Sequence, residues 1–192
     1  VPQQWKSGVV QHKPTNLSFD QAACLPIGAM TALYLLQDAG VETAKKVLVY
    51  GASGSVGSYA VQLAKHYGAI VTGVCSTKNL NMVTSLGADT TVDYTVQDYT
   101  TIDQHYDLVI DAVGKTTKRK AKKILAPNGR FTTVKKMTKE LPSHLMTIKE
   151  LAENNALTPF IDRCFSLDKI VDAHRYVSRG HKRGNVVINI HH

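Results

Sequence analysis

Cysteine is scarce in this chain of 192 residues, where three occur far apart, at Cys24, Cys75 and Cys164. An odd, widely spaced set without a C-x-x-C pair excludes a disulfide framework and a zinc knuckle, and it favours a reducing compartment such as the cytoplasm. Long apolar runs are absent too, because none reaches the roughly 18 residues that a membrane span needs. The first six residues lack the apolar core of a secretory signal. We therefore expect a cytoplasmic protein with no membrane partner.

Acidic residues are outnumbered by basic ones. The 15 Asp and Glu against 23 Lys and Arg give a net charge of +8 and a pI near 9.4. Such an excess favours an anionic partner, either a phosphorylated cofactor, a nucleic acid or an acidic protein. The densest basic stretch, Lys115–Lys123, contains no aromatic residue. A base-stacking nucleic-acid surface is therefore poorly supported, and a solvated helix face is the simpler interpretation.

Short β-branched runs alternate with helical patterns along most of the chain. With 43% hydrophobic and 20% charged residues, the composition is that of a soluble globular protein large enough for an ordinary core. Near-continuous apolar strands separated by helices predict a parallel sheet covered on both faces, and right-handed crossovers make it doubly wound. The fold class is therefore α/β. The predicted strands are 47–50, 70–74, 108–110, 131–134 and 186–190.

Two helices are predicted from apolar periodicity. One runs over Gly54–Tyr67, and a second follows a start signal at Ser166–Asp168, with Ile170, Val171, His174 and Val177 at helical spacing. The segment Val1–Pro26 has neither pattern, so we expect extended or loop structure that ends a preceding unit. This places a domain boundary between residues 1–26 and 27–192.

A glycine-rich turn, Gly51–Gly57, directly follows the first predicted strand and opens the first predicted helix. Its A-x-G-x-x-G form suits a turn in which backbone N–H groups approach a pyrophosphate at a helix N-terminus. Gly54 allows the close approach and Gly57 lets helix and strand pack together. No Gly-Lys-Ser/Thr follows, which excludes a P-loop, and the flanking strand and helix favour a Rossmann dinucleotide-binding turn over a turn without a ligand.

No Asp or Glu occurs between Glu42 and Asp89. A site for NAD usually has a carboxylate at the end of the second strand, about 20 residues after the glycines, to bind the ribose 2′-hydroxyl. Here that strand runs into Cys75–Asn79, whose hydroxyls and Lys78 ammonium would accept a 2′-phosphate. The sequence therefore favours NADP(H) and disfavours a methyltransferase, although Lys78 can also be interpreted as a surface lysine.

The chain resembles the medium-chain dehydrogenase/reductase superfamily, and within it the zinc-independent quinone oxidoreductase branch. The resemblance begins with VLVYGASGSVGSYAVQLAK and continues in order along nearly the whole chain. It implies a Rossmann nicotinamide-cofactor domain and hydride transfer. The matching segments are 47–65, 86–89, 92–94, 106–114, 128–131 and 184–188.

The resemblance implies cofactor-binding roles for individual residues. The pyrophosphate would be lined, mostly through backbone N–H groups, by Ser53, Gly54, Ser55 and Val56. The adenosine 2′-phosphate would be held by Ser76, Lys78 and Tyr94.

Further positions follow from the same resemblance. Val113 and Gly114 would border the adenine side of the cleft. Thr31 matches a threonine near the nicotinamide, although its hydroxyl can also bond within its own helix. Asn185 is a further candidate for approaching the cofactor.

Zinc chemistry is not expected. Zinc-dependent alcohol dehydrogenases of the superfamily have a cysteine ligand four residues before the threonine that matches Thr31, and this chain has Ile27 there. Cys24 does not fit the same position, and no cysteine-rich loop occurs. We therefore expect no metal and prefer reduction of a quinone or an α,β-unsaturated carbonyl, with a zinc-type alcohol dehydrogenase homologue as an alternative. The sequence identifies no catalytic acid or nucleophile.

Two parts of the family pattern are missing. The resemblance implies a GroES-like domain before residue 1, which this sequence does not include, and the segment between Val134 and Leu145 is too short for a strand that usually pairs subunits. For the full-length protein a homodimer is compatible with the resemblance, whereas the missing parts argue against dimerisation and catalysis by this chain alone. A non-catalytic NADP(H)-binding module and a basic RNA- or membrane-surface protein stay open. A short-chain dehydrogenase is disfavoured because no tyrosine begins a Tyr-x-x-x-Lys motif.

Overall fold

A computed structural model describes residues 9–139 and 141–190. Five strands form one sheet in the order β3-β2-β1-β4-β5, and every neighbouring pair is parallel. This main sheet confirms the predicted doubly wound α/β fold. From β1, the strands β2 and β3 are added on one side, and β4 and β5 are added on the other side. Its strands are β1 (Lys46–Tyr50), β2 (Ile70–Cys75), β3 (Thr90–Asp93), β4 (Tyr106–Asp111) and β5 (Leu125–Thr133).

Both faces of the main sheet are buried, as the apolar runs predict. In β1, Val47 and Val49 join the core beneath helices α2, α3 and α6, while Leu48 joins a second cluster on the opposite face. A strand with apolar side chains on both faces is typical of a parallel sheet covered twice. The α-helices are α1 (Phe19–Ala23), α2 (Leu25–Asp38), α3 (Ser55–His66), α4 (Leu80–Ser85), α5 (Lys118–Ala121), α6 (Pro142–Glu153) and α7 (Ile170–Ser178).

Short 3-10 helices connect several of these elements. Two of them, η3 and η5, lead directly into α4 and α7. They are η2 (Val41–Thr43), η3 (Thr77–Asn79), η4 (Tyr99–Thr101) and η5 (Leu167–Lys169). None of the helices in residues 9–139 and 141–190 combines the length and apolarity that spanning a bilayer requires.

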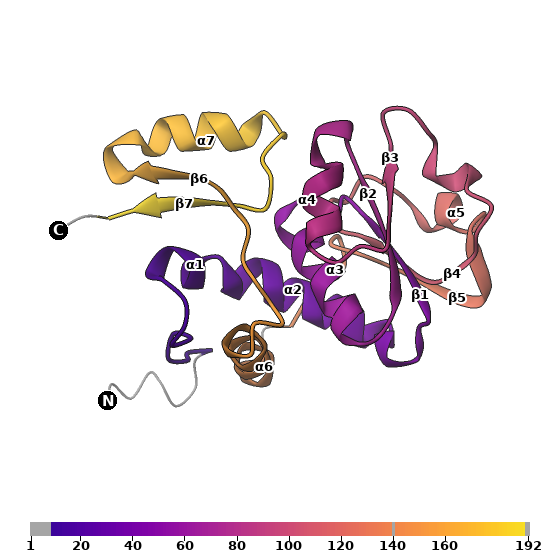
Figure 1. Ribbon diagram of the computed structural model, residues 1–192, viewed down its shortest axis with the longest axis horizontal. Helices are drawn as coiled ribbons and strands as arrows, with labels where there is room; N and C mark the ends of the chain where they lie inside the picture. The colour runs from indigo at the N-terminus through magenta and orange to yellow at the C-terminus, as the bar shows by residue number, and fades with distance from the viewer. Residues whose placement is uncertain (1–8, 140, 191–192) are drawn as a thin grey trace.

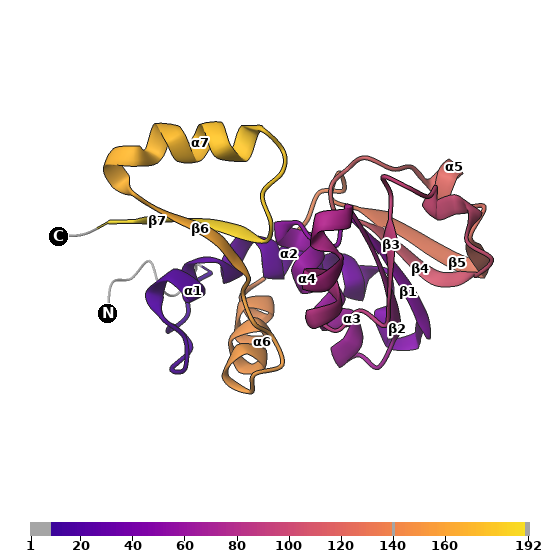
Figure 2. The same cartoon turned by 45° about the horizontal axis from the view of Figure 1, so that its top comes forward.

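The last predicted strand lies outside the main sheet, contrary to expectation. β7 (Asn185–Asn189) pairs in parallel with β6 (Ile161–Ser166), and α7 connects the two strands. We call β6, α7 and β7 the C-terminal unit; Figures 1 and 2 show it on the opposite side of α2 from the main sheet. Its strands are only partly buried. Polar side chains along both strands suit an exposed two-stranded sheet better than the doubly covered interior.

The segment before residue 27 is more helical than expected. Ser18 caps α1 by accepting a hydrogen bond from the Gln21 backbone N–H, and the Gln21 side chain accepts one from the Ser18 N–H. This reciprocal capping box is a known helix start. Pro26 lies in the first turn of α2, where its missing N–H is not needed. The predicted boundary at 26/27 therefore falls inside a helix, residues 1–8 lie outside the described part, and the division into two domains stays a prediction.

Candidate functional site

The glycine-rich turn joins β1 to α3 as predicted. Gly51 has a left-handed φ of 79°, and a Cβ on Gly57 would lie 2.1 Å from the Gly51 carbonyl oxygen. No other residue therefore fits at Gly57 without moving the strand, which confirms its packing role. Gly54 caps α3 without a side-chain hydrogen bond, and its N–H donates to the Gly51 carbonyl at 3.0 Å. The first turn of α3 thus offers backbone N–H groups and a partial positive charge.

A cavity of about 310 Å³ opens at the carboxyl ends of the strands, next to this turn. It lies where the sheet order reverses between β1 and β4, which is where open α/β sheets usually bind ligands. Six of the ten predicted cofactor residues line it together: Ser53, Gly54, Ser76, Lys78, Tyr94 and Val113.

Three of the other predicted residues are neighbours in sequence of residues that line this cavity, but they do not line it themselves. Val56 packs against the core from the first turn of α3, and Gly114 follows Val113 with a φ of 70°. The Ser55 hydroxyl donates to Asn185 Oδ1 at 2.6 Å. Ser55 can therefore serve a ligand through its backbone N–H, whereas its side chain is used within the protein.

Asn185 has a structural role that sequence reasoning missed. Besides accepting from Ser55, its Nδ2 donates to the Tyr59 hydroxyl at 3.2 Å and to the Phe160 carbonyl at 3.1 Å. The side chain is buried, and Tyr59 in turn donates to the Cys24 carbonyl. Asn185 thus fastens β7 to α3 and to the start of α2, and it does not line the cavity.

A carboxylate that the sequence did not predict lies beside the segment that follows β2. Parallel pairing places Asp93 of β3 opposite Cys75, and Asp93 accepts hydrogen bonds from the Thr77 and Thr95 hydroxyls. These bonds from Thr77 and Thr95 hold the pKa of Asp93 below its usual value. The chain has no Asp or Glu between residues 42 and 89, but β3, which pairs with β2, brings the carboxylate of Asp93 close to the end of β2. Asp93 does not line the cavity.

A buried carboxylate shapes the loop on the far side of the cavity. Asp111 ends β4 and accepts the backbone N–H groups of Val113, Lys115 and Thr116 at 3.2–3.3 Å, as well as the Thr133 hydroxyl. It is fully buried. The loop that carries Val113 and Lys115 into the cavity wall is therefore fixed from beneath.

The loop between α7 and β7 supplies cavity residues that sequence reasoning missed, namely Gly180, His181 and Lys182. The Gly184 N–H donates to the Ser53 carbonyl at 2.8 Å, which fastens this loop to the glycine-rich turn. Lys182 Nζ donates to the Gly184 carbonyl at 2.7 Å, and burial lowers the pKa of Lys182. The run His181–Arg183 between two glycines is the signal in the sequence that could have drawn attention to it.

Thr31 lies apart from these residues. It lines a separate cavity of about 150 Å³ with Pro26, Ile27, Met30, Thr138 and Lys139. Ile27 is 75% exposed there and offers no metal ligand. Within residues 9–139 and 141–190, no group of three or more His, Cys, Asp or Glu side chains is arranged to hold a metal ion.

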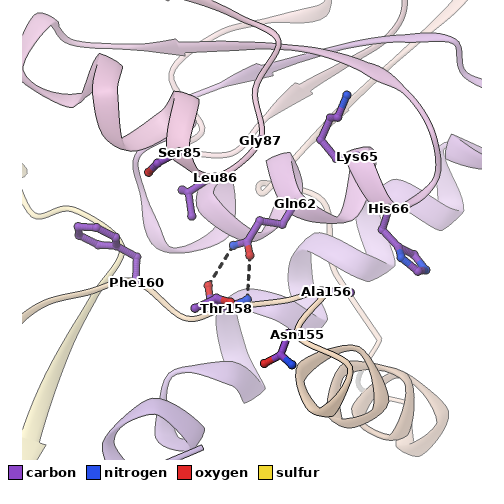
Figure 3. A pocket seen from close by; sticks show the side chains of 10 residues that line it. All are labelled: Gln62, Lys65, His66, Ser85, Leu86, Gly87, Asn155, Ala156, Thr158 and Phe160. Carbon is purple, nitrogen blue, oxygen red and sulfur yellow. Dashed lines mark hydrogen bonds between the residues drawn. The ribbon is translucent and has the colours of Figure 1, made fainter.

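A larger hollow, of about 650 Å³, lies between the C-terminal half of α3, the end of α4 and residues 155–160 (Figure 3). There Gln62 exchanges two hydrogen bonds with the Thr158 backbone, at 2.8 and 3.1 Å (Figure 3). Lys65 is paired with Asp89 at 2.9 Å. These polar groups already have protein partners, and the hollow lies away from the carboxyl ends of the strands. We therefore take the smaller cavity as the candidate site.

The chain matches the family model described as zinc-binding dehydrogenase over residues 55–158, and a second model with the same description over 134–188. The chain belongs to the zinc-binding dehydrogenase family, within the medium-chain dehydrogenase/reductase superfamily. At the position where the resemblance to zinc-dependent members would place a cysteine ligand, this chain has Ile27.

Several members of the superfamily are similar to this chain. It is 38% identical to the 2-methylene-furan-3-one reductase of Solanum lycopersicum over 94% of this chain and 50% of that protein. It is 34% identical to the NADPH-dependent alkenal/one oxidoreductase, chloroplastic, of Arabidopsis thaliana, over 92% of this chain and 48% of that protein. The quinone oxidoreductase structure from Coxiella burnetii superposes with a TM-score of 0.81 at 29% identity, over 94% of this chain and 64% of that one. The chain thus spans about half the length of these curated relatives.

Proposed function

We propose that this chain is the NADP(H)-binding part of a zinc-independent oxidoreductase that transfers hydride to quinones or α,β-unsaturated carbonyls. The observation that carries the proposal is one cavity that joins the glycine-rich turn to Ser76, Lys78 and Tyr94. The names of the tomato and Arabidopsis relatives support an enone substrate and, for the latter, NADPH. A cytoplasmic location and a homodimer stay predictions, and the Arabidopsis relative is called chloroplastic.

The residues present fit a dinucleotide. A Cβ on Gly54 would meet only the Gly51 carbonyl at 3.4 Å and Val113 Cγ1 at 3.7 Å, so a side chain here would project into space that a pyrophosphate would fill. The first-turn N–H groups of α3, including those of Ser55 and Val56, and the Ser53 hydroxyl would bind the pyrophosphate. Lys182 would add a cation from the loop that is hydrogen-bonded to the same turn.

The adenosine end would bind beside β2 and β3. Lys78 and the hydroxyls of Ser76 and Tyr94 would hold the 2′-phosphate, since charge-assisted hydrogen bonds to phosphate are about twice as strong as neutral ones. Val113 and Gly114 would border the adenine. This arrangement favours NADPH over NADH because NADH has only a neutral ribose 2′-hydroxyl here, and no charged phosphate for Lys78 and the two hydroxyls to bind.

The chemistry itself comes from the cofactor, which supplies a hydride to the acceptor when bound. The chain would contribute by holding the dinucleotide at the edge of the sheet, and Thr31, in its separate cavity, would reach the nicotinamide only where the cofactor extends beyond the cavity beside the glycine-rich turn. Because the chain spans about half of its relatives, the acceptor and the group that supplies the proton lie beyond what these residues define. The catalytic contribution of this part is therefore positioning and exclusion of water.

The proposal is tested by titrating the chain with NADPH and NADH and then assaying the full-length protein for NADPH consumption with a quinone and with an enone. We expect tighter binding of NADPH and turnover of at least one acceptor. Tight binding without turnover would favour a non-catalytic NADP(H)-binding module. Equal affinity for both nucleotides would contradict the role of Ser76 and Lys78.

A further inference from the structure

Asn79 lies between the two phosphate-binding halves of the cavity and contacts both. Its Nδ2 donates to Ser53 Oγ of the glycine-rich turn at 3.0 Å and to Ser76 Oγ of the next segment at 3.1 Å. Asn79 lines the cavity, yet only 5% of its surface is exposed. Its backbone N–H donates to the Ser76 carbonyl at 2.8 Å, which fixes the amide relative to the turn. A single buried side chain thus bonds both to the neighbouring Ser76 and to Ser53, which lies 26 positions before Asn79 in the chain.

The hydrogen bonds of Asn79 determine what the two serine hydroxyls can still do. A hydroxyl has one hydrogen to donate and two lone pairs to accept with. Ser53 and Ser76 each accept from the Asn79 amide, and among the described residues neither hydroxyl has an acceptor for its own hydrogen. Both hydroxyls line the cavity, so both hydrogens are available to an anion that enters it.

The orientation of the Asn79 amide follows from its surroundings. Oδ1 is buried without a hydrogen-bond donor among the described residues. If the side-chain amide were flipped, Nδ2 would take the place of Oδ1, and both of its hydrogens would lack an acceptor there. One unpaired carbonyl oxygen costs less than two unpaired buried N–H groups. The orientation that makes both serines acceptors is therefore the favoured one.

We propose that Asn79 is a positioning residue that directs the Ser53 hydroxyl toward the pyrophosphate and the Ser76 hydroxyl toward the 2′-phosphate. This inference rests on the proposed NADP(H) function and adds to it a determinant of cofactor preference. Asn79 acts through the serines and makes no contact of its own with phosphate. Its loss should weaken NADPH binding through both hydroxyls, and NADH binding through Ser53 alone.

A double-mutant cycle in the 192-residue chain tests this role, with the dissociation constants of NADPH and NADH as the readout. Asn79→Ala should weaken NADPH about tenfold and NADH about threefold, because each misdirected hydrogen bond contributes modestly. In a Ser76→Ala background, Asn79→Ala should no longer change the ratio of the two constants, since the hydroxyl through which it acts on that ratio is gone. Independent contributions that multiply in the double variant would overturn the inference.

Asn79→Asp keeps the shape of the side chain and tests the direction of the hydrogen bonds. A carboxylate accepts only, so both serines would donate to it and could no longer donate to a phosphate. We expect NADPH binding to fall about a hundredfold or more, because the new charge also repels the phosphates. A smaller loss than in Asn79→Ala would overturn the proposed orientation.

The controls separate this inference from the proposed function. Asn81→Ala, at an exposed position two residues away on α4, should leave both constants unchanged. An unfolding transition in urea close to that of the wild type shows that each variant is folded, since NADH binding is itself expected to weaken. If the wild-type chain shows no preference for NADPH, the proposed function and this inference fail together. If the wild type prefers NADPH and Asn79→Ala leaves the ratio unchanged, the inference alone fails.

Discussion

The main sheet is buried on both faces, whereas the C-terminal unit leaves much of its apolar surface exposed. Leu48 and Val49 of β1 are fully buried, while Ile170, Val171 and Val177 of α7 are exposed. The main sheet therefore contains its own core, and the C-terminal unit depends on a few specific contacts with the rest of the chain. Both contribute to the same cavity, one through the glycine-rich turn and the other through the loop at 180–182. The candidate site thus combines residues of the main sheet, which has its own core, with residues of the C-terminal unit.

The largest effect is expected from Gly57→Ala, which disrupts the packing of α3 against β1 in the main sheet. The added Cβ would lie 2.1 Å from the Gly51 carbonyl oxygen and 2.8 Å from Ala52 Cα, both backbone atoms that cannot move away easily. Overpacking against backbone should cost about 3 kcal/mol or more of unfolding free energy, measured by urea denaturation, and should abolish nucleotide binding. Gly68→Ala is the control: its φ of 82° is also unfavourable for alanine, but no atom lies within 4 Å of the new Cβ. Similar losses in the two variants would contradict the close packing of α3 on β1.

Asn185→Ala should separate the two regions. It removes the side-chain bonds to Ser55, Tyr59 and Phe160, which costs about 2 kcal/mol, while the Tyr59 bond to the Cys24 carbonyl and the backbone bond from residue 185 to the Phe160 carbonyl stay in place. Hydrogen exchange should then rise over 161–189 while the strands of the main sheet stay protected. Asn154→Ala, at an exposed position after α6, serves as the control. An equal rise in both regions would show that they unfold as one unit.

A smaller, pH-dependent effect is expected within the C-terminal unit. Burial alone would raise the pKa of Asp162, but hydrogen bonds from Tyr176 and Arg183 lower it below its usual value. Because the folded-state pKa is the lower one, this stabilisation is complete well above pH about 4 and is lost as the pH falls through the folded-state value. Hydrogen exchange over 161–189 should therefore accelerate in acid. In Asp162→Asn the unit should be less stable at neutral pH by about 1 kcal/mol and should lose this acid dependence. An unchanged acid response would contradict the role of Asp162.

The sequence predicted the scaffold better than the C-terminal unit, for a physical reason. The turn Gly51–Gly57 and the helix after it are encoded by local spacing, because each glycine is required by neighbouring backbone in the same segment. The pairing of β7 with β6 is not local, and a short apolar run fits either sheet equally well. The helix at Phe19–Ala23 has a local signal in the sequence, the Ser18 and Gln21 capping box, which marks its start.

The residues of the candidate site that belong to a family motif could be predicted from the sequence. The residues that reach the site from segments far apart in the sequence could not. Ser76 and Lys78 follow a strand that the pattern identifies. Asp93 comes from a neighbouring strand, and its approach to Thr77 depends on the register of β2 and β3. A buried asparagine such as Asn79 has no signature in a single sequence, because its importance lies in which hydroxyls surround it.

The most direct measurement is the ratio of the NADH and NADPH dissociation constants in the wild type, in Lys78→Asp and in Lys122→Asp, an exposed lysine outside the cavity. We expect the wild type to bind NADPH at least about tenfold more tightly, the gain of one charge-assisted contact. Lys78→Asp should abolish or reverse this preference while NADH binding changes little, and Lys122→Asp should retain it. Equal affinities in the wild type, or the same loss in both lysine variants, would contradict a 2′-phosphate site at the ends of β2 and β3.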